Sequence, residues 1–209
     1  MRMRATLMVG RGPVVRTIEE TLRAARSGRG GSLFLTGEPG VGKSRLLSEA
    51  AATGFAAGMA KLHGRGSAIG PMVPFRSLTE ALMSLTRAGD PIDPKALGPY
   101  RPVLGRLIPD WSLRTDGASE IGSSIVVLAE AVLRLVGLVG RGRGCLFILD
   151  DLQDADAETL SVVEYIMDNL DQQPVVLLGA VRSEECPARD LATAASQRGV
   201  AVLAEVGRL

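Results

Sequence analysis

A lysine and a serine close a glycine-rich run whose residue types are suited to holding phosphate. The run Gly37-Glu-Pro-Gly-Val-Gly-Lys-Ser44 fits the P-loop pattern GxxxxGK[ST]. Its glycines let the backbone wrap around phosphate with N–H groups pointing inward. Lys43 is suited to reach the β- and γ-phosphates, and the Ser44 hydroxyl is suited to bind Mg²⁺. The predicted nucleotide-binding residues here are Gly37, Glu38, Pro39, Gly40, Val41, Gly42, Lys43, Ser44 and Arg45.

An acidic pair follows the cleanest apolar run of the chain. Cys145-Leu-Phe-Ile-Leu is followed by Asp150 and Asp151, which is a Walker B pattern. An apolar strand that ends in a carboxylate places that acid at the carboxyl edge of a parallel sheet, beside the phosphate loop. Asp150 is therefore the predicted Mg²⁺ ligand. Asp151 is the candidate base that orients or deprotonates the attacking water, and the alternative is an acid that caps a turn or helix.

A third charged side chain, Arg182, ends the apolar run 175–181. In a parallel sheet it also falls at the carboxyl edge, where its guanidinium is suited to contact a γ-phosphate. The alternative is a surface arginine paired with Glu184 or Glu185. The only histidine, His63, is expected to be structural. The guanine-reading sequence NKxD is absent from the chain, which favours ATP over GTP.

Alternating strands and helices must bring these side chains to one edge of the sheet. Apolar runs predict strands at 32–36, 59–64, 145–149, 174–181 and 200–204. Helical spacing predicts helices at 17–25, 43–57, 75–87, 97–107, 118–138, 156–170 and 189–198. This alternation is typical of an α/β fold whose parallel sheet is covered on both faces. The proline-rich span 65–117 is expected to be a helical and loop insertion over the nucleotide or partner face.

Charge and composition argue against several classes of function. The chain carries 24 Lys+Arg against 23 Asp+Glu, for a net charge of +1, so no global charge favours nucleic acid or a membrane surface. Cys145 and Cys186 lack metal-binding spacing. The longest apolar stretch, 125–139, contains two charges and is too short to cross a bilayer. No secretory signal is visible, so the predicted location is the cytoplasm.

Four blocks, taken in order, resemble the AAA+-related STAND ATPases. They are Val9-Gly10-Arg11, the run 37–44, LFILDDLQDADAETL at 146–160 and VVLLGAVRSEE at 175–185. The chain is most similar to the ATPase module of large ATP-binding LuxR-type transcriptional regulators, from about Leu7 to Leu209. The resemblance implies a P-loop NTPase fold with a five-stranded parallel sheet in the order 5-1-4-3-2, flanked by helices.

The same resemblance implies roles for individual residues. Val9, Gly10 and Arg11 look like the N-terminal element that sits against adenine, and Arg182 resembles the sensor that ends the fourth core strand. Two departures are visible. Gln153-Asp154 stands where family members commonly have His-Trp, and Gly12 stands where they have Glu. Both departures concern nucleotide contacts or domain packing rather than a catalytic group.

The predicted function is an ATP-binding, slowly ATP-hydrolysing switch module that uses Mg²⁺. Residues 1–209 are expected to be one P-loop ATPase core from a longer regulator. The resemblance implies that a helical lid, sensor repeats and a DNA-binding helix-turn-helix lie elsewhere in the parent chain, so this domain is not expected to bind nucleic acid. A nucleotide-dependent homo-oligomer is a candidate assembly. Low ATPase activity is expected of the isolated domain.

Two other functions compete with this prediction. A small-molecule P-loop kinase would bind its acceptor in the span 65–117, but the adjacent acids Asp150 and Asp151 suit water activation better. A DNA-handling AAA+ ATPase shares the phosphate loop, but the net charge is close to zero and no basic stripe stands out.

Overall fold

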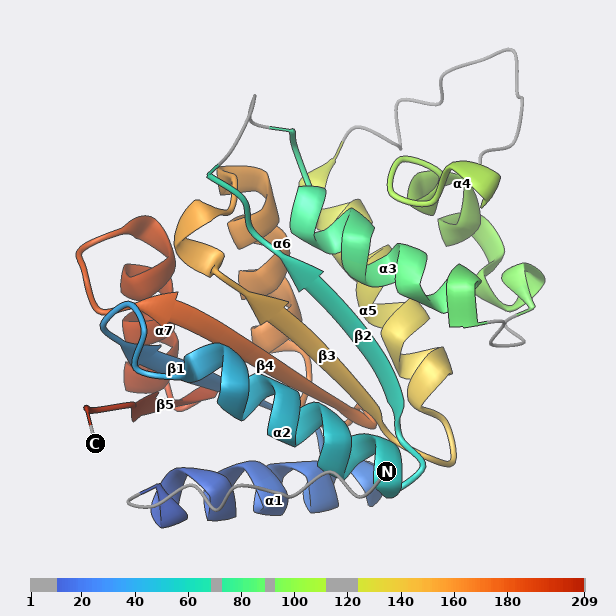
Figure 1. The fold of residues 1–209 in the computed structure, drawn as a ribbon. Helices are drawn as coiled ribbons and strands as arrows, with labels where there is room; N and C mark the ends of the chain where they lie inside the picture. Colours follow the sequence, from blue (N-terminus) through green and yellow to red (C-terminus); the bar gives the residue numbers. More distant parts are fainter. Residues whose placement is uncertain (1–10, 69–72, 89–92, 112–123, 209) are drawn as a thin grey trace.

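A twisted parallel sheet lies between two layers of helices (Figure 1). The computed structural model describes residues 11–68, 73–88, 93–111 and 124–208. The strands are β1 (Gly31–Gly37), β2 (Ala60–Arg65), β3 (Cys145–Asp150), β4 (Val175–Arg182) and β5 (Ala201–Glu205).

The strand order is β2-β3-β4-β1-β5, and all neighbouring pairs are parallel. This confirms the expected order 5-1-4-3-2, seen from the other edge. Both β3 and β4 are almost continuously apolar because side chains on either face of the central strands are buried. The phosphate loop and both carboxyl-edge candidates, Asp150 and Arg182, thereby follow three neighbouring strands.

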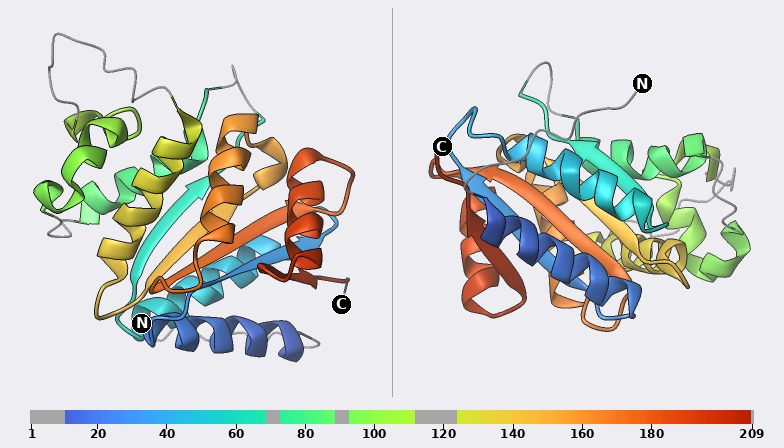
Figure 2. Two further views of the ribbon diagram at one scale, coloured as in Figure 1. Left: turned by 180° about the vertical axis from the view of Figure 1, so that it is seen from behind. Right: turned by 60° about the horizontal axis from the view of Figure 1, so that its bottom comes forward.

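Helices cover the sheet on both faces, as Figures 1 and 2 show. The α-helices of the described chain are α1 (Gly12–Arg26), α2 (Lys43–Ala56), α3 (Arg76–Ala88), α4 (Arg101–Leu104), α5 (Ile125–Gly140), α6 (Ala157–Asp168) and α7 (Pro187–Gln197). Successive strand side chains point to opposite faces. Leu33 and Leu35 accordingly pack with α1 and α2 in one apolar cluster, whereas Phe34 packs in a second cluster that includes α3, α5, α6 and α7.

The insertion is only partly helical. The expected helix at 97–107 is wrong, because two short elements stand there instead, η1 (Pro94–Tyr100) and α4. Gly98 has φ 53° and ψ −129°, and Pro99 follows it, so a continuous helix cannot form. A further short turn, η2 (Pro109–Trp111), is the last described element of the insertion. These elements pack with α5 at the β2 end of the sheet (Figure 1).

Most other expected helices and strands are confirmed to within a few residues. The helix expected at 118–138 is α5, which begins at Ile125, and residues 118–123 lie outside the described part. Asp156 starts α6, because its Oδ1 accepts a hydrogen bond from the Thr159 backbone N–H at 2.9 Å. Within the described ranges, none of the helices is long and apolar enough to cross a membrane.

Candidate nucleotide-binding site

The phosphate loop joins β1 to α2 and is shaped by its backbone. Gly40 and Gly42 have φ values of 78° and 96°, a left-handed region that suits glycine. Gly42 is also the N-cap of α2, where no side chain caps the helix. The first N–H groups of α2, together with the helix dipole, are therefore available to an anion at the loop.

Lys43 lies within this loop and is only 8% exposed. Its Nζ donates to the carbonyl oxygens of Gly37 and Glu38 at 2.7 and 2.9 Å. Burial lowers the pKa of Lys43, and the charges of Asp151 and Asp150 oppose that effect. The strand order places the phosphate loop after β1 and the acidic pair at the end of β3 on the two sides of β4, at one edge of the sheet.

The acidic pair stands at the end of β3. Asp150 is buried, and its Oδ1 accepts from the Asp151 backbone N–H at 2.9 Å. Asp151 adopts a left-handed conformation with φ 51° and ψ 46°, which ends the strand and starts the short turn η4 (Leu152–Asp154). Asp150 is thus the last residue of the strand, and Asp151 is the first residue beyond it.

Both carboxylate oxygens of Asp151 accept hydrogen bonds. Arg65, at the end of β2, donates through Nε to Oδ2 at 2.6 Å, and its Nη2 forms an ion pair with the same oxygen at 2.6 Å. Gln153 donates through Nε2 to Oδ1 at 3.0 Å. Burial raises the pKa of Asp151, but the bonds from Gln153 and Arg65 outweigh it, so the pKa lies below its ordinary value. Asp151 is thus an ionised and fully engaged carboxylate.

Arg182 ends β4 directly beside the phosphate loop. Its register partner on β1 is Gly37, and the next residue, Ser183, donates its backbone N–H to the Gly37 carbonyl at 3.2 Å. The charge of Arg182 lowers the pKa of both Lys43 and Asp151. Its guanidinium therefore lies within electrostatic range of the phosphate-binding lysine and the candidate base.

Arg11 lies behind the phosphate loop rather than on its surface. It is buried, and its Nη2 donates to the carbonyl oxygen of Val41 and, at 3.3 Å, to that of Gly207. Its Nη1 is buried without a hydrogen-bond partner among the described residues, next to Gly42. Val9 and Gly10, the other predicted adenine-side residues, lie outside the described part of the chain.

The remaining predicted loop residues are solvent-facing. Glu38, Pro39 and Gly40 are exposed, and so are Ser44 and Arg45. The Glu38 carboxylate accepts from Arg208 Nε at 2.7 Å, and Arg45 pairs with Glu49 one turn along α2 at 3.3 Å.

Residues 7–178 match the family described as the AAA ATPase domain. The chain belongs to this AAA ATPase family. No curated protein matches the chain significantly.

Solved structures share the fold at low sequence identity. A Walker-type ATPase of Pyrococcus abyssi is 14% identical with a TM-score of 0.53, over 96% of this chain and 54% of that one. Cdc6p from Pyrobaculum aerophilum is 15% identical with a TM-score of 0.58, over 96% of this chain and 46% of that one. A STAND protein with a tetratricopeptide repeat sensor from Pyrococcus horikoshii is 14% identical with a TM-score of 0.49, over 98% of this chain and 24% of that one. The AAA ATPase domain thus spans about half of the first two structures and a quarter of the third.

The geometry of this AAA ATPase domain fits a nucleotide with its metal. The start of α2 has no side-chain cap, so its first backbone N–H groups are available to an anionic ligand at the phosphate loop. Ser44 and Asp150 supply a hydroxyl and a carboxylate, the hard oxygen ligands that Mg²⁺ prefers. These two residues would hold the ion beside the phosphates.

Two residues of this site were missed by the sequence analysis, Arg65 and Gln153. The position of Arg65 follows from the strand register, which sets it opposite Asp150. A register between β2 and β3 has no signal in the sequence. Gln153 was visible only as a departure from the family pattern.

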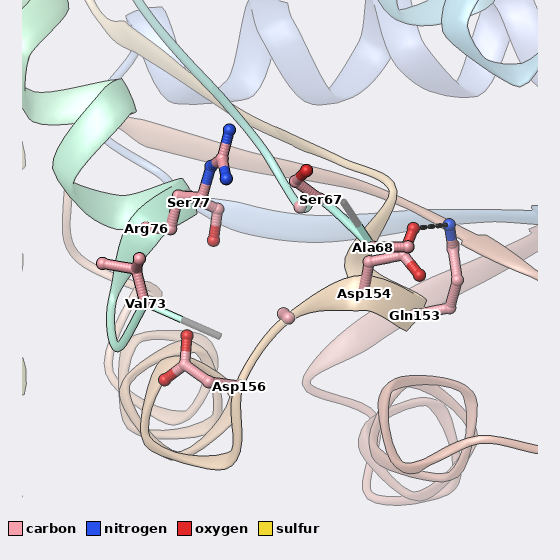
Figure 3. A pocket seen from close by; sticks show the side chains of 10 residues that line it. Ser67, Ala68, Val73, Arg76, Ser77, Gln153, Asp154 and Asp156 are labelled. Carbon is pink, nitrogen blue, oxygen red and sulfur yellow. Dashed lines mark hydrogen bonds between the residues drawn. The ribbon is translucent and has the colours of Figure 1, made fainter. Parts of the chain in front are cut away.

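A cavity of about 220 Å³ opens at the same edge, beyond Gln153 (Figure 3). It is lined by residues 66–68, the start of α3 and residues 153–156. Ligand sites usually occupy about 300–1,000 Å³, so this space is small for a phosphoryl acceptor. Among the described residues, the insertion reaches this edge through Arg65, residues 66–68, Val73 and the start of α3.

Proposed function

We propose that this AAA ATPase domain is the ATP-dependent switch module of a bacterial signalling or transcriptional regulator of the LuxR type. The observation that carries the proposal is the state of Asp151, whose two carboxylate oxygens are both engaged by Arg65 and Gln153. A carboxylate whose two oxygens already accept hydrogen bonds is a weaker base toward water. Such a site suits prolonged ATP binding with slow hydrolysis.

ATP binding uses the loop and the end of β4. The Nζ of Lys43 exchanges its two backbone carbonyls for phosphate oxygens, which are stronger, charged acceptors. Ser44 and Asp150 would hold Mg²⁺, and the ion would supply positive charge that neutralises the phosphates of the nucleotide. Arg182 supplies the contact that distinguishes ATP from ADP, because only ATP places a γ-phosphate near its guanidinium.

Hydrolysis requires an in-line water near Asp151. Arg65 occupies Oδ2 of this carboxylate, but its side chain is 64% exposed, and exposed ion pairs contribute only about 0–1 kcal/mol. Releasing Arg65 therefore costs little. Asp151 then orients the water and takes its proton as the water oxygen bonds to the γ-phosphorus. The bond from that phosphorus to the bridging oxygen breaks, ADP leaves, and the proton passes from Asp151 to solvent.

Residues 206–208, which follow β5, contact β1 and the phosphate loop. The Val206 backbone N–H donates to the Thr36 carbonyl at 2.7 Å, and Arg208 pairs with Glu38. Gly207 accepts from Arg11, which also holds the Val41 carbonyl. A loop that tightens on phosphate shifts these contacts, so the two nucleotide states differ at residues 206–208, as a switch needs.

Calorimetry with ATP and ADP in the presence of Mg²⁺ tests the function. Both nucleotides are expected to bind, and Lys43→Ala is expected to weaken ATP binding at least about a hundredfold, because charged hydrogen bonds to two phosphates are lost. Lys61→Ala, an exposed lysine on β2, is the matched control. Binding that survives Lys43→Ala unchanged would place the nucleotide elsewhere.

Turnover assays separate the competing functions. ATP hydrolysis that is slow and independent of additives supports the switch. Phosphoryl transfer to nucleosides or similar acceptors would identify a kinase instead. A large stimulation of hydrolysis by DNA would identify a DNA-handling ATPase.

A further inference from the structure

Gln153 joins three groups at the carboxyl edge of the sheet. Its Nε2 donates to Asp151 Oδ1 and to Asp154 Oδ2, each at 3.0 Å, and Figure 3 shows the second bond. Its Oε1 accepts from the Arg182 backbone N–H at 3.3 Å. One side chain therefore links the candidate base to the last residue of β4.

The orientation of this amide is determined by its partners. Ionised carboxylates only accept hydrogen bonds, and a backbone N–H only donates. The reversed amide would set Oε1 against two carboxylates and its NH₂ against the N–H of Arg182. Only the observed orientation satisfies all three partners.

Gln153 is the inner of the two side chains that hold Asp151. Arg65 reaches Asp151 from the exposed end of β2, and such a pair is easily broken in water. Gln153 is half-buried and lies two residues beyond Asp151. Its bond therefore survives conditions under which the Arg65 pair opens.

We propose that Gln153 is a positioning residue for ATP hydrolysis, which holds the Asp151 carboxylate in place and ties it to the end of β4. The proposal rests on the hydrolysis proposed above. Arg182 shifts when its guanidinium contacts a γ-phosphate. Gln153 then moves with it, because Gln153 accepts a hydrogen bond from the Arg182 backbone N–H. The geometry of the base thus depends on whether the γ-phosphate is present.

Amide hydrogen exchange at Arg182 tests the link without any nucleotide. Gln153→Ala removes the acceptor, so exchange of this N–H is expected to accelerate several-fold, up to about tenfold, as for the loss of one hydrogen bond. Gln153→His keeps one donor and one acceptor and is expected to restore protection. Unchanged exchange in a folded Gln153→Ala chain would overturn the link.

Single-turnover hydrolysis at saturating ATP and Mg²⁺ tests the role. Gln153→Glu keeps the shape but cannot donate, and it adds a third carboxylate beside Asp151 and Asp154. The rate constant is expected to fall about tenfold or more, while the Kd for ATP stays within about twofold. Gln153→His is expected to remain near the wild-type rate. Gln172→Glu, the same charge change before β4 and far from the site, is expected to alter neither quantity.

A double-mutant cycle distinguishes positioning from a general structural role. In an Asp151→Asn background, Gln153→Glu is expected to cause no further loss, because the group it positions has been removed. The same fold loss in both backgrounds would overturn the positioning role. A wild-type chain that binds but never hydrolyses ATP overturns the proposed function, whereas a hydrolysing chain that is insensitive to Gln153→Glu overturns only the role of Gln153.

Discussion

The two halves of the nucleotide site are built from different parts of the chain. On the β1 side, backbone forms the phosphate loop, with left-handed glycines at Gly40 and Gly42 and two carbonyls that hold Lys43. On the β3 side, side chains define the geometry, because Arg65 and Gln153 donate hydrogen bonds to Asp151. In the first half Lys43 is buried, whereas in the second half Asp151 is partly exposed and Arg65 is exposed.

This difference between backbone and side-chain contacts fits separate roles of the two halves in ATP binding and in hydrolysis. A loop defined by its backbone takes its overall shape from glycine conformations, so phosphate binding needs only small adjustments of it. Side-chain contacts at an exposed edge rearrange at low cost, since an exposed ion pair contributes about 0–1 kcal/mol. The phosphate loop is therefore suited to hold ATP, and the β3 edge is suited to control when it is hydrolysed. Four substitutions test this division.

The largest effect is expected at Asp151. Asp151→Asn removes the group that orients and deprotonates water, so the hydrolysis rate is expected to fall about a hundredfold or more. ATP affinity is expected to change only a few-fold, because the loop is intact. Single-turnover assays and calorimetry measure the two quantities, and Asp171→Asn, at an exposed acid near the amino ends of the strands, is the control. A parallel loss of ATP binding would show that the two halves do not act separately.

A substitution in the phosphate loop is expected to lower ATP affinity, which Asp151→Asn leaves almost unchanged. Gly42→Ala forces a side chain into a φ of 96° and sets its Cβ 3.0 Å from Nη1 of Arg11. The free energy of unfolding is expected to drop by about 1–3 kcal/mol, with weakened ATP binding. Urea denaturation and calorimetry measure this, with Gly207→Ala as the control, because its Cβ has open space. Wild-type ATP affinity in Gly42→Ala would contradict a backbone-defined loop.

A smaller effect is expected from Arg65→Ala. Oδ2 of Asp151 becomes available to water, so steady-state hydrolysis is expected to rise by up to about fivefold, the equivalent of a weak exposed ion pair. Stability should be almost unchanged. Lys61→Ala removes another exposed positive charge from the same strand and controls for net charge. Slower hydrolysis in Arg65→Ala would mean that Arg65 supports Asp151 rather than restraining it.

The smallest effect is expected from Arg208→Ala. Its ion pair with Glu38 is highly exposed on both sides, so the unfolding free energy is expected to fall by less than about 1 kcal/mol. Arg198→Ala, which breaks the distant pairs with Glu164 and Asp168, provides the comparison in thermal unfolding. A far larger loss for Arg208→Ala than for Arg198→Ala would mean that residues 206–208 support the loop more strongly than an exposed pair can.

The sequence alone predicts the position of the phosphate loop between a strand and a helix. The loop 37–44 folds from contacts within a few residues, so its glycines and Lys43 have a local signature. The sequence wrongly predicts one helix at 97–107. Gly98 and Pro99 interrupt an otherwise helical apolar pattern, and two short elements form instead. Arg11 was expected beside adenine, and the structure adds its buried contacts with Val41 and Gly207, which no local pattern indicates.

The sequence by itself determined the strand–helix alternation, the phosphate loop and the acid at the end of β3, because apolar periodicity and glycine conformations act over a few residues. Only the tertiary structure decided that Arg65 meets Asp151 across 86 positions and that Gln153 meets the end of β4 across 29. Those contacts depend on the register and neighbour order of parallel strands, which are set by packing of the whole sheet. The phosphate loop is thus local in origin, whereas the contacts of Asp151 that we propose to govern hydrolysis exist only in the folded chain.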